Sequence, residues 1–238
     1  MLVSGSVAAK PARMVDPAEP IELVGPPPRF VGRGGEKLDA ALEGFVVAVT
    51  GKRCLDAGAS TGGFTDCLLQ RGATEVVAVD VGYGQLHERL RSDPRVRNIE
   101  RTNIRSLTPD DIDGTVDILV ADLSFISLRL VMAALVSLAR PAADLVLLVK
   151  PQFEAGRQEA ARGRGVISDA EIWRRVLGEV RAAAASHGAA MMGAMPSPIT
   201  GAEGNVEFLV HCRVGATEAL DDDALDEVVA AARALHGG

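Results

Sequence analysis

A glycine-rich run constrains the fold of this chain more than any other feature. Residues 55–64 read LDAGASTGGF, after a short apolar stretch and before a helix-like segment that starts at Thr65. Asp80 lies 22 residues after Gly58 and ends a second apolar stretch. An acidic side chain at this distance binds the ribose hydroxyls of a nucleotide cofactor when both stretches are strands of one parallel sheet. The run therefore predicts a strand–turn–helix nucleotide site.

The spacing of the glycines favours one kind of cofactor. Gly58, Gly62 and Gly63 do not reproduce the GxGxxG pattern of dinucleotide sites. S-adenosylmethionine (SAM) has no pyrophosphate for a tight glycine turn to bind, so we expect SAM and not a dinucleotide. A glycine-rich turn without a ligand is the alternative, and Asp80 argues against it because it is a second signal at the required distance.

Strand-like and helix-like segments alternate along most of the chain. From Gly35, apolar residues recur at helical spacing up to Val49. Further helices are expected at 65–70, 86–92, 128–139 and 169–186, and strands at 53–56, 76–80, 96–100, 116–121 and 145–149. Apolar stretches at 190–194 and 206–214 predict a terminal antiparallel pair, followed by a helix from Asp221. The pattern predicts an α/β fold with a doubly wound, Rossmann-like, mostly parallel sheet of the class I methyltransferase type.

The first 28 residues differ from the rest. A run of three prolines at 26–28 cannot be helical. We expect residues 1–28 to be the remnant of a small N-terminal domain with a proline-rich linker, and residues 29–238 to form the methyltransferase domain. A chain of 238 residues is long enough for one sizeable core of this kind.

The charge of the chain bears on its partners. The formal net charge is −7 and the pI is about 5.2, whereas proteins that bind nucleic acid usually present a basic surface. Arginines cluster locally at 29–33, 89–97 and 157–164, so a single basic face remains open as an alternative.

No sequence signal predicts a metal, a membrane span or a secretory leader. Cys54, Cys67 and Cys212 lack metal-ligand spacing, and the four histidines are scattered. No apolar run is long enough to cross a bilayer, and the N-terminus lacks the apolar core of a signal peptide. We expect a cytoplasmic protein without a metal.

Four ionisable residues stand at the ends of predicted elements and face the inferred cofactor. Lys37 lies on the entry helix, Asp122 and Lys150 each follow an apolar strand, and Glu207 begins a late strand. Such residues are costly to bury unless they pair, and two lysines with two acids can pair and shift the pKa values of one another. A solvated charge at a strand end explains one of these residues better than it explains all four.

Several blocks of sequence share the pattern of one family. They read RGGEKL at 33–38, LDAGASTGGFT at 55–65, VGYGQL at 81–86, ERTN at 100–103, ADLSFI at 121–126, LVKPQFE at 148–154 and GNVE at 204–207. From Phe30 to about Val214, the chain resembles the TlyA-type (hemolysin A) methyltransferases, which are FtsJ-like SAM-dependent enzymes.

The resemblance implies a catalytic tetrad and a cofactor site. In that family a Lys-Asp-Lys-Glu tetrad activates a ribose 2′-hydroxyl of ribosomal RNA, and Lys37, Asp122, Lys150 and Glu207 match it. Lys150 would be the base or the orienting group, with the two acids tuning its charge and Lys37 holding the acceptor oxygen. The implied SAM site consists of Gly58, Ser60, Gly62, Gly63, Phe64, Asp80, Val81, Asn103 and Asp122.

The N-terminus departs from the family pattern. Relatives carry a complete S4-type RNA-binding domain there, whereas residues 1–24 resemble only its later strands. Either the coding start is placed too late, or the enzyme lost the RNA-binding part when it took another substrate. With the acidic balance, we favour the second explanation.

Three functions follow from these alternatives. The favoured one is methylation of a small aromatic metabolite, for example indole carbon three of a tryptophan-derived cyclic dipeptide, under a roof made by loop 156–165 and Trp173. The alternative is ribosomal RNA 2′-O-ribose methylation. A non-catalytic SAM-binding accessory protein is the third possibility, which the complete tetrad argues against. A homodimer is also expected as a possible state.

Overall fold

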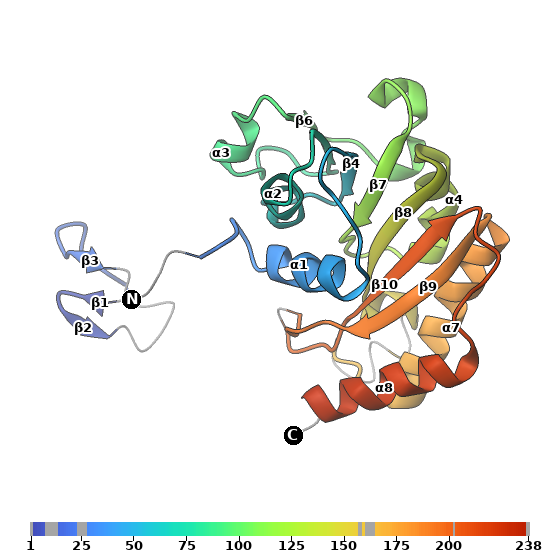
Figure 1. The fold of residues 1–238 in the computed structure, drawn as a ribbon. Helices are drawn as coiled ribbons and strands as arrows, with labels where there is room; N and C mark the ends of the chain where they lie inside the picture. The colour runs from blue at the N-terminus through green and yellow to red at the C-terminus, as the bar shows by residue number, and fades with distance from the viewer. Residues whose placement is uncertain are drawn as a thin grey trace.

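The computed structural model describes residues 2–7, 14–22, 28–156, 159, 165–201 and 203–236. Within them, a seven-stranded sheet has the order β6-β5-β4-β7-β8-β10-β9 (Figure 1). The strands β4 to β8 pair in parallel, and β10 pairs antiparallel with β8 and β9. Their bounds are β4 Arg53–Ala57, β5 Glu75–Val79, β6 Val96–Ile99, β7 Val116–Ala121, β8 Ala139–Val149, β9 Ala189–Pro196 and β10 Phe208–Val214.

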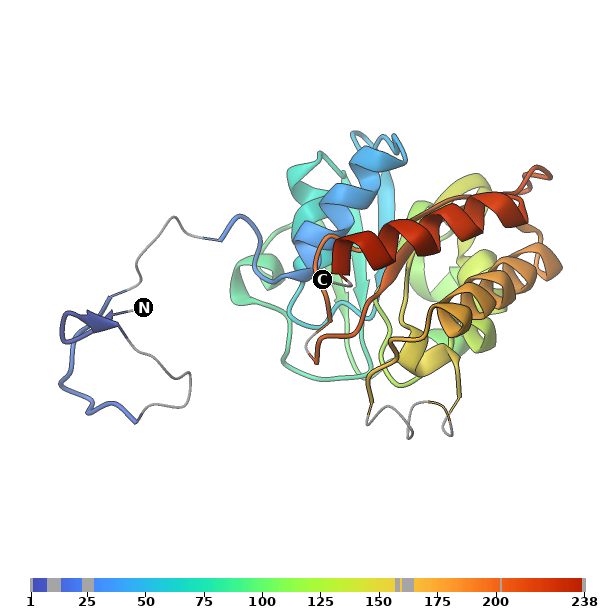
Figure 2. The same cartoon turned by 90° about the horizontal axis from the view of Figure 1, so that it is seen from below.

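Helices cover both faces of this sheet, so its central strands are apolar on both sides. On one face, Val146 and Leu148 pack with α1 and α2, and on the other Leu145 and Leu147 pack with α4 and α7. Helix α8 packs beside α7 and β9, as Figure 2 shows from below. The helices are α1 Gly34–Gly44, α2 Gly63–Gln70, α3 Glu88–Arg91, α4 Leu128–Leu138, α5 Pro151–Glu154, α7 Ala170–Ser186 and α8 Asp222–His236, with short 3₁₀ turns η1 Ile104–Ser106 and η2 Pro109–Ile112.

A second, small sheet lies near the N-terminus. It consists of β1 Leu2–Val3, β2 Ser6–Val7 and β3 Ile21–Glu22, all antiparallel, in the order β2-β1-β3. Both ribbon views show it away from the large sheet (Figures 1 and 2). Residues 23–27, which include part of the expected proline-rich linker, lie outside the described residues. The division into residues 1–28 and 29–238 stays a prediction.

The predicted α/β fold with a terminal antiparallel strand is confirmed, and the differences concern element ends. Strand β8 starts at Ala139, six residues before the predicted start. The sequence does not predict this first part as a strand, because residues 140–142 are exposed, include Pro141 and do not alternate between buried and exposed positions. Helix α3 spans only four residues, Glu88–Arg91. Glu207 lies just before β10 and not inside it. Most of loop 156–165, the expected roof, lies outside the described residues.

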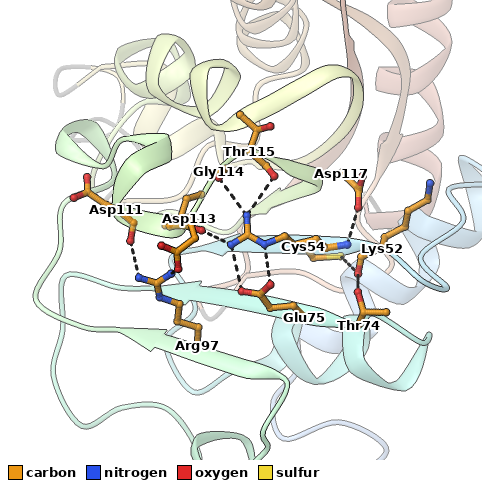
Figure 3. Close-up of polar contacts among 12 residues, drawn as sticks. Lys52, Cys54, Thr74, Glu75, Arg97, Asp111, Asp113, Gly114, Thr115 and Asp117 are labelled. Carbon is orange, nitrogen blue, oxygen red and sulfur yellow. Dashed lines mark hydrogen bonds and ion pairs between the residues drawn. The ribbon is translucent and has the colours of Figure 1, made fainter.

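Arg53 connects the amino ends of β4 and β5 to the loop before β7, and Figure 3 labels three of its partners, Glu75, Gly114 and Thr115. Its guanidinium donates to both carboxylate oxygens of Glu75, at 2.8 and 3.3 Å. The other donors reach the backbone carbonyls of Ile112, Gly114 and Thr115, the last two at 3.2 and 3.3 Å. All five N–H groups of the side chain are therefore used, and they tie β4 to β5 and to the loop before β7.

Candidate functional site

The candidate site lies at the opposite edge, where the parallel strands end. Gly58, Asp80, Asp122 and Lys150 directly follow β4, β5, β7 and β8. The register pairs Ala57 with the last residues of β5 and β7, so the turns that follow lie side by side. The chain proceeds from β4 to β5 on one side and later to β7 on the other, and ligands of doubly wound sheets bind at such a switch point.

Gly58 is required by the close approach of two turns. Its φ is +85°, and a Cβ at this position would meet the backbone oxygen of Asp122 at 2.6 Å. Any side chain would therefore push the turn after β4 away from the turn after β7.

A cavity of about 420 Å³, called here the larger cavity, opens between these turns. It is lined by Gly58, Ser60, Val79, Asp80, Val81, Gln85, Thr102, Asn103, Ile104, Asp122, Leu123, Ser124, Phe125 and Ile126. Six of the nine predicted cofactor residues lie among these, namely Gly58, Ser60, Asp80, Val81, Asn103 and Asp122.

Asp80 is held by two backbone amides. Ser60 N–H donates to one carboxylate oxygen at 2.8 Å and Gly82 N–H donates to the other at 2.7 Å. Each oxygen keeps a further lone pair, so the carboxylate can still accept from the two hydroxyls of a ribose. This geometry fits the role predicted from the distance between Asp80 and Gly58.

A smaller cavity of about 180 Å³ adjoins the first. It is lined by Gly32, Arg33, Gly34, Gly58, Ala59, Ser60, Thr61, Gly63, Phe64, Asp122, Ser124 and Lys150. The N-termini of α1 and α2 meet here, since a Cβ on Gly63 would lie 3.0 Å from Gly35 N. Two helix N-termini and the exposed Arg33 favour a carboxylate.

Gly62 differs from the neighbouring glycines. It lines neither cavity, and with φ at +98° a Cβ there would meet Leu90 Cδ1 at 2.2 Å. The structure thus explains Gly62 by its packing against α3, and its predicted contact with the cofactor stays a prediction.

The first charged pair of the tetrad lies where the two cavities join. Lys150 Nζ forms an ion pair with Asp122 Oδ1 at 2.5 Å, and only 11% of the lysine side chain is exposed. Lys150 Nζ also donates to Ser124 Oγ at 3.0 Å and lies 5.9 Å from the centre of the Phe153 ring. Asp122 and Lys150 therefore meet as predicted, together with a serine that sequence reasoning missed.

The second pair is more deeply buried. Lys37 Nζ donates to Glu207 Oε2 at 2.5 Å, and the two residues are 7% and 3% exposed. A Cβ on Gly201 would meet Glu207 Oε1 at 2.6 Å, so the loop before β10 covers the carboxylate closely. Burial of both charges requires the pair, because either charge alone would be uncompensated.

The two pairs are neighbours. Phe208 is paired with Val149, which places Glu207, just before β10, next to Lys150, just after β8. Gly34, at the start of α1, would bring a Cβ to 3.8 Å from Asp122 Oδ2. Four elements far apart in the sequence thus bring the predicted tetrad to one end of the sheet.

Phe125 is a second residue that sequence reasoning missed. Its side chain lines the larger cavity, is 90% exposed and has a φ of +63°, which is strained for a residue other than glycine. Its ring lies 5.1 Å from that of Phe153. An exposed aromatic residue beside Asp122 offers a flat surface to an incoming ring, and the LSF sequence after Asp122 was the available signal.

The buried carboxyl group of Asp56 lies next to the site. Burial, together with the charges of Asp122 and Asp80, raises the pKa of Asp56 to about 7, against a hydrogen bond from the Thr65 hydroxyl that lowers it. That hydroxyl lies 2.7 Å from Asp56 Oδ2, whereas Oδ1 is buried without a partner in the described part of the chain.

No metal cluster or membrane span was found where the structure is described. Residues 2–7, 14–22, 28–156, 159, 165–201 and 203–236 contain no group of three or more His, Cys, Asp or Glu side chains placed to hold a metal. Among the helices of these same ranges, none is both long and apolar enough to cross a membrane.

The chain is similar to known methyltransferases. The family model of FtsJ-like methyltransferases matches residues 30–214. The chain is 49% identical over 228 residues to the 16S/23S rRNA (cytidine-2′-O)-methyltransferase TlyA of Mycobacterium tuberculosis, covering 95% of this chain and 85% of the relative. It is 37% identical to hemolysin A of Brachyspira hyodysenteriae over 212 residues, covering 89% and 88%.

Solved structures show the same fold. A protein of Streptococcus thermophilus, provisionally named a hemolysin, superposes with a TM-score of 0.87 at 42% identity over 97% of this chain and 84% of its own. An S-adenosylmethionine-dependent methyltransferase of Mesorhizobium loti has a TM-score of 0.53 at 16% identity over 73% of this chain and 96% of its own, which supports the fold alone.

Proposed function

Because this chain belongs to the FtsJ-like methyltransferase family and is a SAM-dependent methyltransferase, we propose that its acceptor is a ribose 2′-hydroxyl of ribosomal RNA. The observation that carries the proposal is the Lys150–Asp122 pair at the junction of the two cavities, beside the Lys37–Glu207 pair. The relative with 49% identity is named for this activity.

The other two functions have less support. The aromatic metabolite favoured from the sequence has no support among the relatives, which favour the ribosomal RNA alternative. A purely SAM-binding accessory protein is not what the family match indicates, since the family is one of enzymes. Net charge was a weak guide because it averages over the surface, and the exposed Arg33, Arg101 and Arg105 lie on or next to segments that line the cavities.

The residues present fit SAM. Asp80 would hold the ribose hydroxyls, and the larger cavity beside Asn103 and Ile104 would hold the adenine. The smaller cavity, with two helix N-termini and Arg33, would take the carboxylate of the methionine end. Gly58, Ser60, Asp122 and Ser124 line both cavities, so the sulfur between the two ends would lie next to Lys150.

The tetrad then acts on the acceptor. When bound, SAM would supply a methyl group on a sulfonium. The sulfur would leave as a neutral thioether and keep the electron pair of the broken S–C bond. Lys150 orients the acceptor hydroxyl and takes its proton, and Asp122 holds the amine in place. Lys37, fixed by Glu207, holds the acceptor oxygen or its neighbouring groups. Phe125 offers its exposed ring to the base of the methylated nucleotide.

The test is methyl transfer from labelled SAM to purified ribosomal subunits from a strain without this enzyme. We expect label in ribosomal RNA at a 2′-O-methyl position, mapped by its resistance to alkaline cleavage, and labelling about 100-fold slower or more with Lys150→Ala. Labelling of an indole panel by the wild-type protein, with none in ribosomal RNA, would reject the proposal and restore the aromatic acceptor. Action on ribosomes would also imply the expected cytoplasmic location. The homodimer stays a prediction.

A further inference from the structure

The amine of Lys150 has two partners on one loop, the ion-pair partner Asp122 and the hydrogen-bond acceptor Ser124. Asp122 Oδ1 lies 2.5 Å away and Ser124 Oγ lies 3.0 Å away. Both partners belong to the segment after β7, and Lys150 follows β8, so the contacts cross between neighbouring parallel strands. Ser124 also lines both cavities, which places its hydroxyl at their junction.

Two partners of this kind can orient a lysine that acts as a base. A protonated amine has three N–H groups and no lone pair. To take a proton, the amine must first lose one, and two N–H groups and one lone pair remain. The hydrogen bond to Ser124 Oγ directs one N–H, and the ion pair draws the positive side of the amine toward Asp122, so the lone pair of the tetrahedral nitrogen points away from both. The ion pair with Asp122 alone directs no single N–H, so without Ser124 the amine could rotate about its Cε–Nζ bond.

The loop that carries Ser124 is held at two points. On its far end, the buried Glu154 accepts from Leu128 N–H at 2.6 Å and from the hydroxyl of Ser127. Near its middle, Phe125 adopts a φ of +63° and its ring lies against Phe153, which comes from the same short helix as Glu154. Ser124 is therefore presented to Lys150 by a constrained backbone, although its side chain is exposed.

We propose that Ser124 is a positioning residue of the methyl transfer, which aims the lone pair of Lys150 at the acceptor oxygen. The inference rests on the proposed function for the identity of the acceptor. The amine first releases one proton to water. The O–H proton of the acceptor would then pass to Lys150 Nζ as the oxygen forms its bond to the methyl carbon and the S–C bond of SAM breaks, with its electron pair staying on the sulfur of the departing thioether. The ammonium that results faces Asp122, Ser124 and the product oxygen. No further reactant is needed.

The test compares Ser124→Ala and Ser124→Thr with the wild type. Ser137→Ala is the matched control, because Ser137 is exposed on α4 and its hydroxyl donates only to the Ala134 carbonyl in the described structure. We expect Ser124→Ala to lower kcat about 10- to 100-fold, the scale of a misdirected reacting group. The Kd for SAM, measured by calorimetry, should stay within about threefold, since backbone and Asp80 supply the main contacts. Ser124→Thr should recover most of the rate because it keeps a hydroxyl.

A second measurement does not depend on the acceptor. Competition acetylation with mass spectrometry should show faster labelling of Lys150 in Ser124→Ala than in the wild type or Ser124→Thr, with Lys52 as the internal reference. Equal labelling of Lys150, or an Ala variant with normal kcat and weakened SAM binding, would overturn the positioning role. If the wild type leaves ribosomal RNA unmethylated while the labelling result holds, the proposed function fails and the Ser124 inference stands.

Discussion

Glu154 accepts a hydrogen bond from the backbone N–H of Leu128 at 2.6 Å and thereby joins the helix after Lys150 to the loop after Asp122. The same carboxylate accepts from the Ser127 hydroxyl and pairs with Arg129, whose guanidinium also donates to the Glu154 backbone carbonyl at 2.8 Å. Burial raises the pKa of Glu154 against these hydrogen bonds. One carboxylate thus supports both members of the Lys150–Asp122 pair from outside the cavities.

Loss of this carboxylate should loosen both loops. We expect Glu154→Ala to lower the free energy of unfolding by about 1–3 kcal/mol, because it leaves the donors of Ser127 and Leu128 without a partner. Turnover should fall too, since Leu123 to Ile126 line the larger cavity. Urea unfolding and steady-state kinetics give the two readings. Glu154→Gln should be milder, and Glu218→Ala, at an exposed site, should change neither. An unaltered free energy of unfolding of Glu154→Ala would contradict the supporting role of the Glu154 carboxylate.

Asp80 should decide the affinity for SAM and for its demethylated product. We expect Asp80→Ala to weaken both by about 1.5–3 kcal/mol, the scale of a hydrogen bond to a charged group. Calorimetry measures the change, and Asp223→Ala on the exposed face of α8 is the control. Because Asp80 also binds Ser60 and Gly82 amides, circular dichroism should confirm that the fold is kept. Unchanged affinity in a folded variant would exclude the ribose contact.

Lys150 should separate binding from chemistry. Replacement by Ala should lower turnover about 100-fold or more, the range of acid–base groups, and leave the Kd for SAM nearly unchanged. Lys52→Ala removes the same charge at the far end of the sheet and should leave both values intact. Wild-type turnover by Lys150→Ala on the true acceptor would remove the tetrad from the mechanism.

The core of the fold was predictable because its signals are local. The turn at Gly58 and the acid at Asp80 each follow a short apolar run, and parallel register alone brings them together. The start of β8 was missed because Arg140, Pro141 and Ala142 are exposed and resemble a loop. Gly62 was grouped with the cofactor glycines, whereas its contact with Leu90 is decided by where α3 packs.

The supporting residues of the site were less accessible from sequence. Lys150 and Ser124 are 26 residues apart, and so are Glu154 and Leu128, so neither contact has a local pattern. Ser124 and Glu154 also belong to residue types that are common at turns and helix ends. The four tetrad residues could be predicted because several charges at the ends of apolar elements are unusual. The acceptor could not, because net charge averages over the whole surface and carries no information on one face.

Asp56 should make stability depend on pH. Its pKa is raised from 3.8 to about 7, so the folded protein binds this proton more tightly than the unfolded chain. The contribution is fully present below about pH 4 and is lost as pH rises to about 7, with at most about 4 kcal/mol at stake at 1.36 kcal/mol per pKa unit. Asp56→Asn lacks the titration. The free energy of unfolding of Asp56→Asn, relative to that of the wild type, should therefore increase from pH 5 to pH 8. A constant difference would mean that Asp56 does not hold a proton.

Arg53 should matter for stability and not for chemistry. Its five hydrogen bonds end on Glu75 and on three backbone carbonyls, at the amino ends of the strands, whereas Lys150 follows the carboxyl end of β8. Arg53→Ala leaves those carbonyls unpaired and should lower the free energy of unfolding by about 2–4 kcal/mol. Arg53→Lys should recover little, because an ammonium cannot reproduce the planar fork.

Thermal and urea unfolding measure the effect of Arg53, with the exposed Arg233→Ala on α8 as the control. At a temperature where Arg53→Ala is still folded, its kcat and its Kd for SAM should equal those of the wild type. The described side-chain hydrogen bonds of Arg53 end on Glu75, Ile112, Gly114 and Thr115, and none of these lines either cavity. A loss of turnover in the fully folded variant would show that the two ends of the sheet are coupled. A free energy of unfolding within about 0.5 kcal/mol of the wild type would show that the hydrogen bonds of Arg53 contribute little.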